Sequence, residues 1–152
     1  MTTLYILRHA RAEAAAASGQ DRDRPLSSQG RLQCEALAEK LARGQPEPPA
    51  TVLASPAVRA MQTAEAVLAG IQGPEIEQDE RIWEAGVADL VAVISEATDR
   101  PGPVMVVGHN PGLEALVRTL TGELQPMGTA ALAVLELQGP PGPGTAELVG
   151  VI

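Results

Sequence analysis

The sequence predicts a three-layer α/β/α domain, in which a mainly parallel sheet lies between helices on both faces. Short apolar runs alternate with stretches whose apolar residues repeat at helical spacing, and this alternation is typical of a parallel sheet. The chain has 152 residues, a length that indicates a single domain over residues 1–152. Apolar residues make up 45% of the chain, which suits a packed core and argues against disorder.

The first strand is predicted at residues 3–8 and the first helix at 28–43, with a polar, Ala-rich loop at 10–26 between them. Ser27 or Ser28 can cap this helix, because a serine hydroxyl accepts a hydrogen bond from a free backbone N–H at a helix start. The apolar positions of the helix and its stop signal are Cys34, Leu37, Ala38, Leu41 and, after them, Gly44.

The second strand is predicted at residues 51–54, where the chain is again apolar. Ser55 and Pro56 follow it with the residue types of a helix N-cap and a first helical position. We therefore expect the second helix to begin there and to run to about Leu68. A short strand is expected at 75–77, before the next helical pattern begins.

The third helix is predicted at 87–97, where apolar residues repeat every three or four positions, and the next strand at 103–108. Asn110 and Pro111 then predict a second cap-plus-proline helix start. The fourth helix that begins there is expected to end at Gly122, since glycine commonly terminates helices.

The last two strands are expected at 130–137 and 146–151, joined by a loop rich in proline and glycine. They could add an antiparallel edge to the sheet. Aromatic residues are almost absent, so the core is expected to consist of Leu, Val, Ile, Met and Ala.

The composition excludes several classes of partner and site. The net charge of −8 argues against nucleic acid, because binding to its phosphate backbone needs a basic surface. Cys34 is the only cysteine, so no internal disulfide is possible, and two histidines with scattered carboxylates predict no metal site. No run approaches about 18 apolar residues, so we expect no membrane-spanning helix and no membrane partner. The N-terminus is interpreted as a strand rather than a signal peptide, which predicts a cytoplasmic location.

The two histidines of the chain both follow apolar runs that end predicted strands. His9 comes directly after residues 3–8, next to Arg8, and His109 comes directly after residues 103–108. Open α/β sheets bind ligands at the carboxyl ends of their parallel strands. Because the guanidinium fork of arginine matches the oxygens of a phosphoryl group, we interpret this edge as a phosphoryl-binding site.

Three more residues are candidates for binding the same group. Arg59 lies in the first turn of the second predicted helix, and Asn110 follows His109 at another helix start, where free backbone N–H groups favour an anion. Arg24 lies in a run of alternating charge at the end of the 10–26 loop. The alternative for Arg24 is a solvated loop residue, and we assign it to the phosphate-facing side.

Each residue also has an ordinary structural explanation when it is taken alone. A single histidine is more often structural than catalytic, Arg8 could pair with a surface carboxylate, and Arg59 could lie on a helix surface. Ser55 is better explained as a helix cap than as a nucleophile, and Cys34 as a core residue. The gathering of several such groups at strand ends is what favours a functional site.

Four segments of the chain together form a recognisable pattern. In chain order they are Leu7-Arg8-His9-Ala10, Arg24-Pro25-Leu26-Ser27-Ser28-Gln29-Gly30, Ser55-Pro56-Ala57-Val58-Arg59-Ala60-Met61-Gln62-Thr63-Ala64 and Val107-Gly108-His109-Asn110-Pro111-Gly112. Their order and spacing resemble the signature of the histidine phosphatase superfamily, which has the phosphoglycerate-mutase-like fold. The short length and the His-Asn-Pro block most resemble the bacterial phosphohistidine phosphatases of the SixA type.

The resemblance implies that His9 is the nucleophile, and that Arg8, Arg59 and His109 bind the phosphoryl oxygens without a metal or another cofactor. A neutral imidazole would attack phosphorus and form a phosphohistidine, which water then hydrolyses. This chemistry needs a neutral His9 and is helped by a charged His109. We therefore expect the site to shift the pKa values of the two histidines apart.

The resemblance leaves the proton donor open. Glu80 and Glu84 flank Trp83 in the relevant part of the chain, and either could protonate a leaving oxygen. The alternative is that both are ordinary surface carboxylates. A site without an acid would favour a phosphohistidine substrate, because imidazole leaves more easily than an alkoxide.

Three functions remain open at the level of sequence. The first is a phosphatase of phosphohistidine on a partner protein, such as a histidine phosphotransfer domain. The second is a phosphatase of small phosphorylated metabolites, such as sugar or nucleoside phosphates. The third is a phosphate-binding module without turnover, against which the presence of all four site residues argues.

Overall fold

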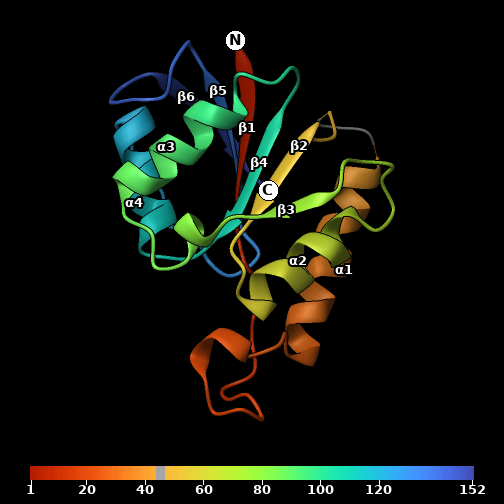
Figure 1. The fold of residues 1–152 in the computed structure, drawn as a ribbon. Coiled ribbons are helices and arrows are strands. Elements are labelled where there is room, and N and C mark those ends of the chain that lie inside the picture. The colour runs from red at the N-terminus through yellow and green to blue at the C-terminus, as the bar shows by residue number, and fades with distance from the viewer. Residues whose placement is uncertain (44–46) are drawn as a thin grey trace.

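A six-stranded sheet forms the middle layer of the protein (Figure 1). The computed structural model describes residues 1–43 and 47–152, so the predicted stop signal Gly44 lies outside the described residues. The strand order is β3-β2-β4-β1-β5-β6. The strands are β1 (Thr2–Arg8), β2 (Thr51–Ala54), β3 (Ile76–Gln78), β4 (Val104–Gly108), β5 (Leu132–Leu137) and β6 (Ala146–Val151).

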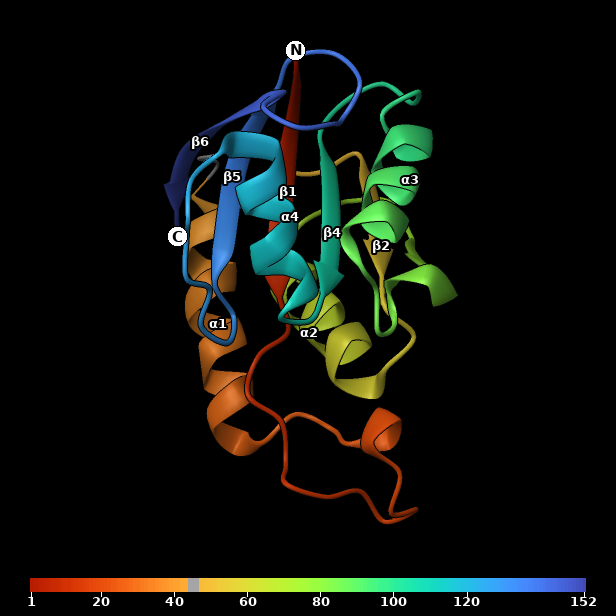
Figure 2. The ribbon, with the colours of Figure 1, turned by 90° about the vertical axis from the view of Figure 1, so that its left-hand side faces the viewer.

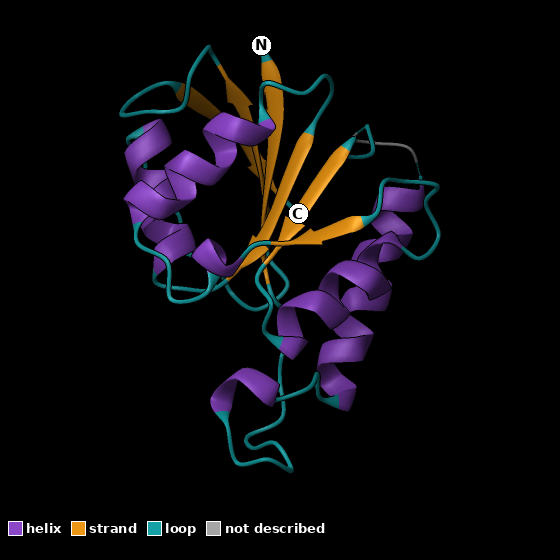
Figure 3. Cartoon of the chain, viewed as in Figure 1, coloured by secondary structure: helices purple, strands orange, loops and turns teal. Residues whose placement is uncertain are grey.

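Two helices cover each face of the sheet (Figures 1 and 3). They are α1 (Ser28–Ala42) and α2 (Val58–Leu68) on one face, and α3 (Val87–Ala97) and α4 (Gly112–Thr121) on the other. Figure 2 looks onto the face that α3 and α4 cover. The predicted three-layer arrangement is therefore confirmed.

The side chains of β1 alternate between the two helical layers. Leu4 and Ile6 pack into the apolar cluster that contains α3 and α4, whereas Tyr5 and Leu7 pack into the cluster that contains α1 and α2. Side chains of a strand point to opposite faces in turn, so a continuous apolar run supplies both layers. The central position of β1 follows from this double burial.

The sheet is parallel in its first part and antiparallel at one edge. β1 pairs in parallel with β4, β4 with β2, and β2 with β3. β5 runs antiparallel to β1, and β6 runs antiparallel to β5, as expected for the two last strands. Among the described residues, no helix is long and apolar enough to cross a membrane.

Most element boundaries agree with the predictions. The strand at 51–54 and the helix at 87–97 have the predicted bounds, and the strand expected at 75–77 begins one residue later. Ser27 is the N-cap of α1, and its side chain accepts a hydrogen bond from the backbone N–H of Gly30 at 3.0 Å.

The predicted start of the second helix is wrong. α2 begins at Val58, three residues after Ser55, and its N-cap residue is Ala57. Ser55 instead accepts a hydrogen bond from the backbone N–H of Ala57 at 3.2 Å and contacts the ring of His109. The hydroxyl therefore has a long-range partner that local sequence patterns do not reveal.

The predicted start of the fourth helix is wrong in the same way. α4 begins at Gly112, and Pro111 rather than Asn110 is the N-cap. The side-chain amide of Asn110 donates to the backbone carbonyl of Met127 at 2.9 Å. Gly112 is needed at the helix start, because a Cβ there would lie 2.6 Å from the carbonyl oxygen of Ala85.

Candidate active site

The two histidines lie side by side at the carboxyl edge of the sheet. β1 and β4 are parallel neighbours, with Arg8 paired in register with Gly108, so the residues that follow leave the sheet together. The backbone N–H of His9 donates to the carbonyl of Gly108 at 3.0 Å. The ring centroids of His9 and His109 are 5.1 Å apart.

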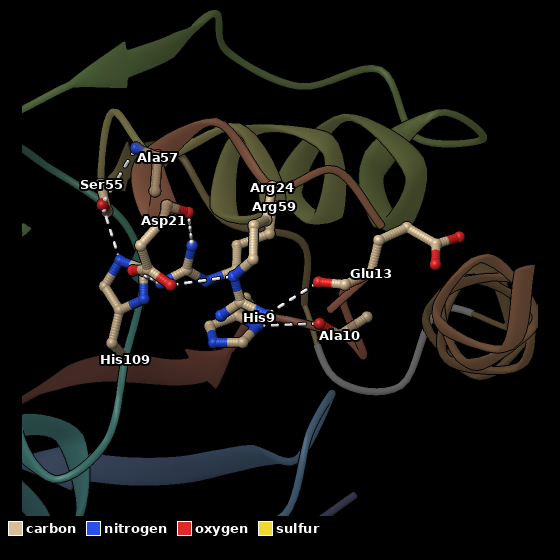
Figure 4. A network of polar contacts seen from close by, with 9 residues as sticks. All are labelled: His9, Ala10, Glu13, Asp21, Arg24, Ser55, Ala57, Arg59 and His109. Atoms are coloured by element: carbon tan, nitrogen blue, oxygen red, sulfur yellow. Dashed lines mark hydrogen bonds and ion pairs between the residues drawn. The ribbon is translucent and has the colours of Figure 1, made fainter. Parts of the chain in front are cut away.

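His9 is held in one defined tautomer. The residue is 9% exposed, and its Nδ1 lies 2.8 Å from the carbonyl oxygen of Ala10, to which it can only donate (Figure 4). The Nε2 atom of the neutral ring then carries a free lone pair. Burial lowers the pKa of His9 to about 4, with help from the charges of Arg59 and Arg8 and against the hydrogen bond to Ala10. His9 is therefore a neutral potential nucleophile near pH 7.

Two arginines contribute buried donors to the same site. Arg8 donates from Nη1 to the carbonyl of Met127 at 3.0 Å, and Arg59, which is 5% exposed, donates to the backbone and side chain of Asp21 at 2.8 and 3.1 Å. The Nε atoms of both guanidiniums are buried and have no hydrogen-bond partner in the described parts of the chain. Buried, unpaired N–H donors on two cations favour the binding of an anion.

His109 also lies in a positively charged environment, and it is partly buried. Its Nε2 lies 2.7 Å from the hydroxyl oxygen of Ser55, and the edge of Trp83 contacts its ring, with centroids 5.3 Å apart. Burial lowers the pKa of His109 to about 3, and His9 and Arg59 add to this effect.

The expectation that His109 is charged is therefore wrong for the site without an anion. Both histidine pKa values move in the same direction, because the same burial and the same guanidiniums act on both rings. The fixed positive charge of the site comes from arginine.

Arg24 belongs to this network through Asp21 rather than to a solvated loop. Its Nε donates to one carboxylate oxygen of Asp21 at 2.8 Å, while Arg59 pairs with the other oxygen (Figure 4). Its Nη1 donates to the carbonyl of Glu13 at 2.8 Å. Burial works against ionisation of Asp21, but Arg59 and Arg24 together outweigh it and lower the pKa of this carboxyl. Asp21 thus forms ion pairs with both Arg24 and Arg59, which were predicted to bind phosphate.

Asn110 lies at the site, where one of the two N–H donors of its side-chain amide is used. Its amide nitrogen donates to the carbonyl of Met127, the same oxygen that accepts from Arg8. Its buried Oδ1 has no partner among the described residues. The acceptor oxygen does not bind an anion, so a phosphoryl group could be bound only through the second amide N–H, and this role of Asn110 stays a prediction.

The structure separates the two candidate proton donors. Glu80 has 71% of its side chain exposed and pairs with Arg22. Glu84 is also exposed, but it lines a cavity of about 340 Å³ together with Arg59, Trp83 and His109. If a carboxylate acts on a leaving group, Glu84 is the one in position.

Three residues of the site were missed or misassigned from the sequence. They are Asp21, which pairs with Arg59, Ser55, which contacts His109, and Thr63. Thr63 accepts from the backbone N–H of residue 10 at 2.9 Å and donates to the carbonyl of Arg59 at 2.7 Å. Two signals were available for Thr63, namely its place in the segment from Ser55 to Ala64 that resembles the family signature and its spacing of four residues from Arg59 on the same helix face. Within residues 1–43 and 47–152, no group of three or more His, Cys, Asp or Glu could hold a metal ion.

Comparison with known families agrees with this geometry. The family model of the histidine phosphatase superfamily, branch 1, matches residues 4–91, more than half of the chain. The chain belongs to the histidine phosphatase superfamily. A search of curated protein sequences finds no match.

Solved structures of this superfamily resemble the whole chain. SixA from Agrobacterium tumefaciens is 30% identical, with a TM-score of 0.86 over 99% of this chain and 97% of its own. A tungstate complex of the protein histidine phosphatase SixA is 29% identical, with a TM-score of 0.87 over 99% and 96% of the two chains. SixA from Nakamurella multipartitia is 28% identical, with a TM-score of 0.85 over 99% and 95%. Family and relatives together support phosphatase activity.

Proposed function

We propose that this histidine phosphatase superfamily member hydrolyses phosphohistidine on a partner protein, without a metal, through a phosphohistidine intermediate on His9. The observation that carries the proposal is the fixed tautomer of His9. Its Nδ1 is engaged with the carbonyl of Ala10, so a free Nε2 lone pair lies among Arg8, Arg59 and His109. A neutral nucleophile next to two cations suits attack on a phosphoryl group.

The residues of the site account for each step of this reaction. Nε2 of His9 attacks phosphorus, and the bond from phosphorus to the leaving nitrogen breaks on the opposite side. The substrate histidine leaves as a neutral imidazole, because its distal ring nitrogen has taken a proton from solvent. Arg8, Arg59 and an N–H of His109 hold the equatorial oxygens, whose charge is spread in a loose transition state. Water then attacks the phosphorus on His9, its proton goes to bulk solvent, and inorganic phosphate leaves. Positioning and charge do most of the work, so no metal is required.

The chemistry of the leaving group favours phosphohistidine over a phosphate ester. An imidazole leaves readily, whereas an alkoxide needs a proton from a positioned acid. Glu80 is exposed and paired with Arg22, and Glu84 is an exposed residue at the cavity wall. That cavity, of about 340 Å³ beside His109 and Trp83, has room for the ring of a substrate histidine. A relative named as a protein histidine phosphatase also supports a protein substrate.

The position of Glu84 is the observation that favours a second candidate function. A carboxylate beside the cavity could protonate the oxygen of a small phosphate monoester, such as a sugar or nucleoside phosphate. In that case the substrate would be a phosphorylated metabolite rather than a histidine phosphotransfer domain.

One experiment tests the proposal against both alternatives. Wild type and His9→Asn are compared on a phosphohistidine protein and on a sugar phosphate, with EDTA present throughout. We expect wild type to prefer phosphohistidine, His9→Asn to be inactive, and an acid-labile, base-stable phosphoryl label to appear on wild type alone. Faster turnover of the sugar phosphate would establish the monoester function. Undiminished hydrolysis by His9→Asn would refute the nucleophile, and phosphate binding without any turnover would indicate a binding module.

A further inference from the structure

Ser55 is a fully buried polar residue at the site, and the mechanism above does not use it. It follows β2 directly, its residue is 0% exposed, and its backbone N–H donates to the carbonyl of Val107 at 3.0 Å. Its hydroxyl oxygen has two partners. These are the backbone N–H of Ala57 at 3.2 Å and Nε2 of His109 at 2.7 Å.

The two contacts fix the direction of the hydrogen bond to His109. The N–H of Ala57 can only donate, so Ser55 accepts there and retains its own proton. If the oxygen accepted from both groups, its own proton would be buried without a partner among the described residues, so the arrangement that satisfies the hydroxyl has Ser55 donate to Nε2 of His109. A neutral His109 with an accepting Nε2 carries its ring proton on Nδ1.

The charges around His109 keep its ring neutral. The charged and titratable groups that act on it are His9, Arg59, Asp21 and Arg8, and only Asp21 favours the protonated form. The uncharged ring of Trp83 lies against His109 in a T-shaped arrangement. A second proton on the ring would meet two guanidiniums in a buried site.

The Nδ1–H of His109 is then available to a ligand. Nδ1 is buried, has no partner within the described residues, and lies on the ring edge turned toward Arg59 and His9 (Figure 4). His9 and His109 thus carry the proton on the same ring atom but offer opposite groups to the site. His9 presents a lone pair for attack, whereas His109 presents an N–H for an oxyanion.

We propose that Ser55 is a positioning residue that holds His109 in its Nδ1–H tautomer, so that a neutral imidazole serves as a hydrogen-bond donor to the phosphoryl oxygens. The kinetic part of this proposal rests on the proposed phosphatase function, whereas the tautomer is a property of the free protein. Without the hydroxyl, the ring proton can move to Nε2, and a bare Nδ1 would then face the phosphoryl oxygens. Loss of one oxyanion donor typically slows catalysis by about 10² to 10³.

The first test reads the tautomer directly in the wild-type protein. The chain has two histidines, so ¹⁵N-histidine labelling gives four ring nitrogens, and His9→Asn assigns them. We expect a protonated Nδ1 and an unprotonated, hydrogen-bonded Nε2 for His109 at about pH 7, a pH in the ordinary range for resolving histidine states. A protonated Nε2 on His109 would overturn the proposal, whatever the activity of the protein.

The second test compares three serine variants. Ser55→Ala should redistribute the His109 proton toward Nε2, weaken inhibition by inorganic phosphate, and lower kcat by roughly tenfold or more. Ser55→Thr keeps a hydroxyl and should retain the wild-type ring signals, and Ser95→Ala, at an exposed site on α3, should change nothing. A Ser55→Ala variant that loses activity with the His109 tautomer unchanged would show a merely structural role. Wild type without turnover but with the expected tautomer would refute the phosphatase function and not the role of Ser55.

Discussion

Acidification should destabilise this protein through its two buried histidines. The pKa values of His9 and His109 are lowered from 6.5 to about 4 and about 3 in the folded state. The unfolded chain therefore takes up protons at a higher pH than the folded chain does. By linkage, the stability is complete above the unfolded pKa and falls as the pH drops from 6.5 toward the folded values.

The size of this effect follows from the two pKa values. Between about pH 7.5 and pH 5, the unfolded form of each histidine gains most of a proton while the folded form stays neutral, which costs about 2 kcal/mol per histidine. Wild type should therefore lose about 4 kcal/mol of unfolding free energy from the two rings together. Carboxylates such as Asp21 also change the free energy of unfolding at low pH. The informative quantity is therefore the difference in the free energy of unfolding between wild type and a variant that lacks one histidine.

The matched variant is His9→Asn, because an asparagine amide can still donate toward the carbonyl of Ala10 but does not titrate. Urea unfolding of both proteins can be followed through Trp83, the only tryptophan, in buffers without phosphate or sulfate. On going from about pH 7.5 to pH 5, the unfolding free energy of the variant should rise relative to wild type by about 2 kcal/mol. A difference that stays constant over this range would refute a neutral, buried His9.

Three more substitutions have defined outcomes. Asp21→Asn removes a carboxylate that competes with phosphate for Arg59. Inorganic phosphate should therefore inhibit the variant about five- to tenfold more tightly than wild type in a competition assay. Unchanged inhibition would contradict this role of Asp21. Gly30→Ala would place a Cβ 2.0 Å from the carbonyl oxygen of Arg11. Urea unfolding should show that the free energy of unfolding falls by an amount on the order of 3 kcal/mol. An unchanged free energy of unfolding would contradict the close contact. Glu84→Gln should slow phosphohistidine hydrolysis by less than about threefold, because an imidazole needs no strong acid, and a loss of about 10² or more would identify Glu84 as the acid.

The layered fold could be predicted because its signals are local. Each buried strand is a short apolar run, and each helix shows apolar residues at helical spacing, so element type and order follow from the chain itself. Helical connections make β1, β2, β3 and β4 parallel, but the position of β1 beside β4 is a long-range feature that the apolar runs alone did not predict. The meeting of His9 and His109 at one sheet edge is a direct consequence of that pairing.

The predictions that were wrong concern side chains whose contacts lie far away in the sequence. The hydroxyl of Ser55 has a local explanation as a helix cap, but its partner His109 lies 54 residues further along the chain. The pKa of His109 depends on burial and on guanidiniums from other elements, which no local pattern reports. The pairing of Asp21 with Arg59 spans 38 residues and was invisible for the same reason.

The sequence signature of the family therefore has two physical parts. Only a few of its side chains offer free groups to the site, and the others hold the loop after β1 in place. Gln62 accepts from the backbone N–H of Leu26 at 2.8 Å, and Thr63 accepts from that of Ala10 at 2.9 Å, so one turn of α2 fixes both ends of the loop. Gly30 lets α1 approach the same loop from the other side. Because Asp21 lies in this loop and pairs with Arg59 of α2, the signature residues that hold the loop also help to determine the position of a guanidinium that we propose binds the phosphoryl group.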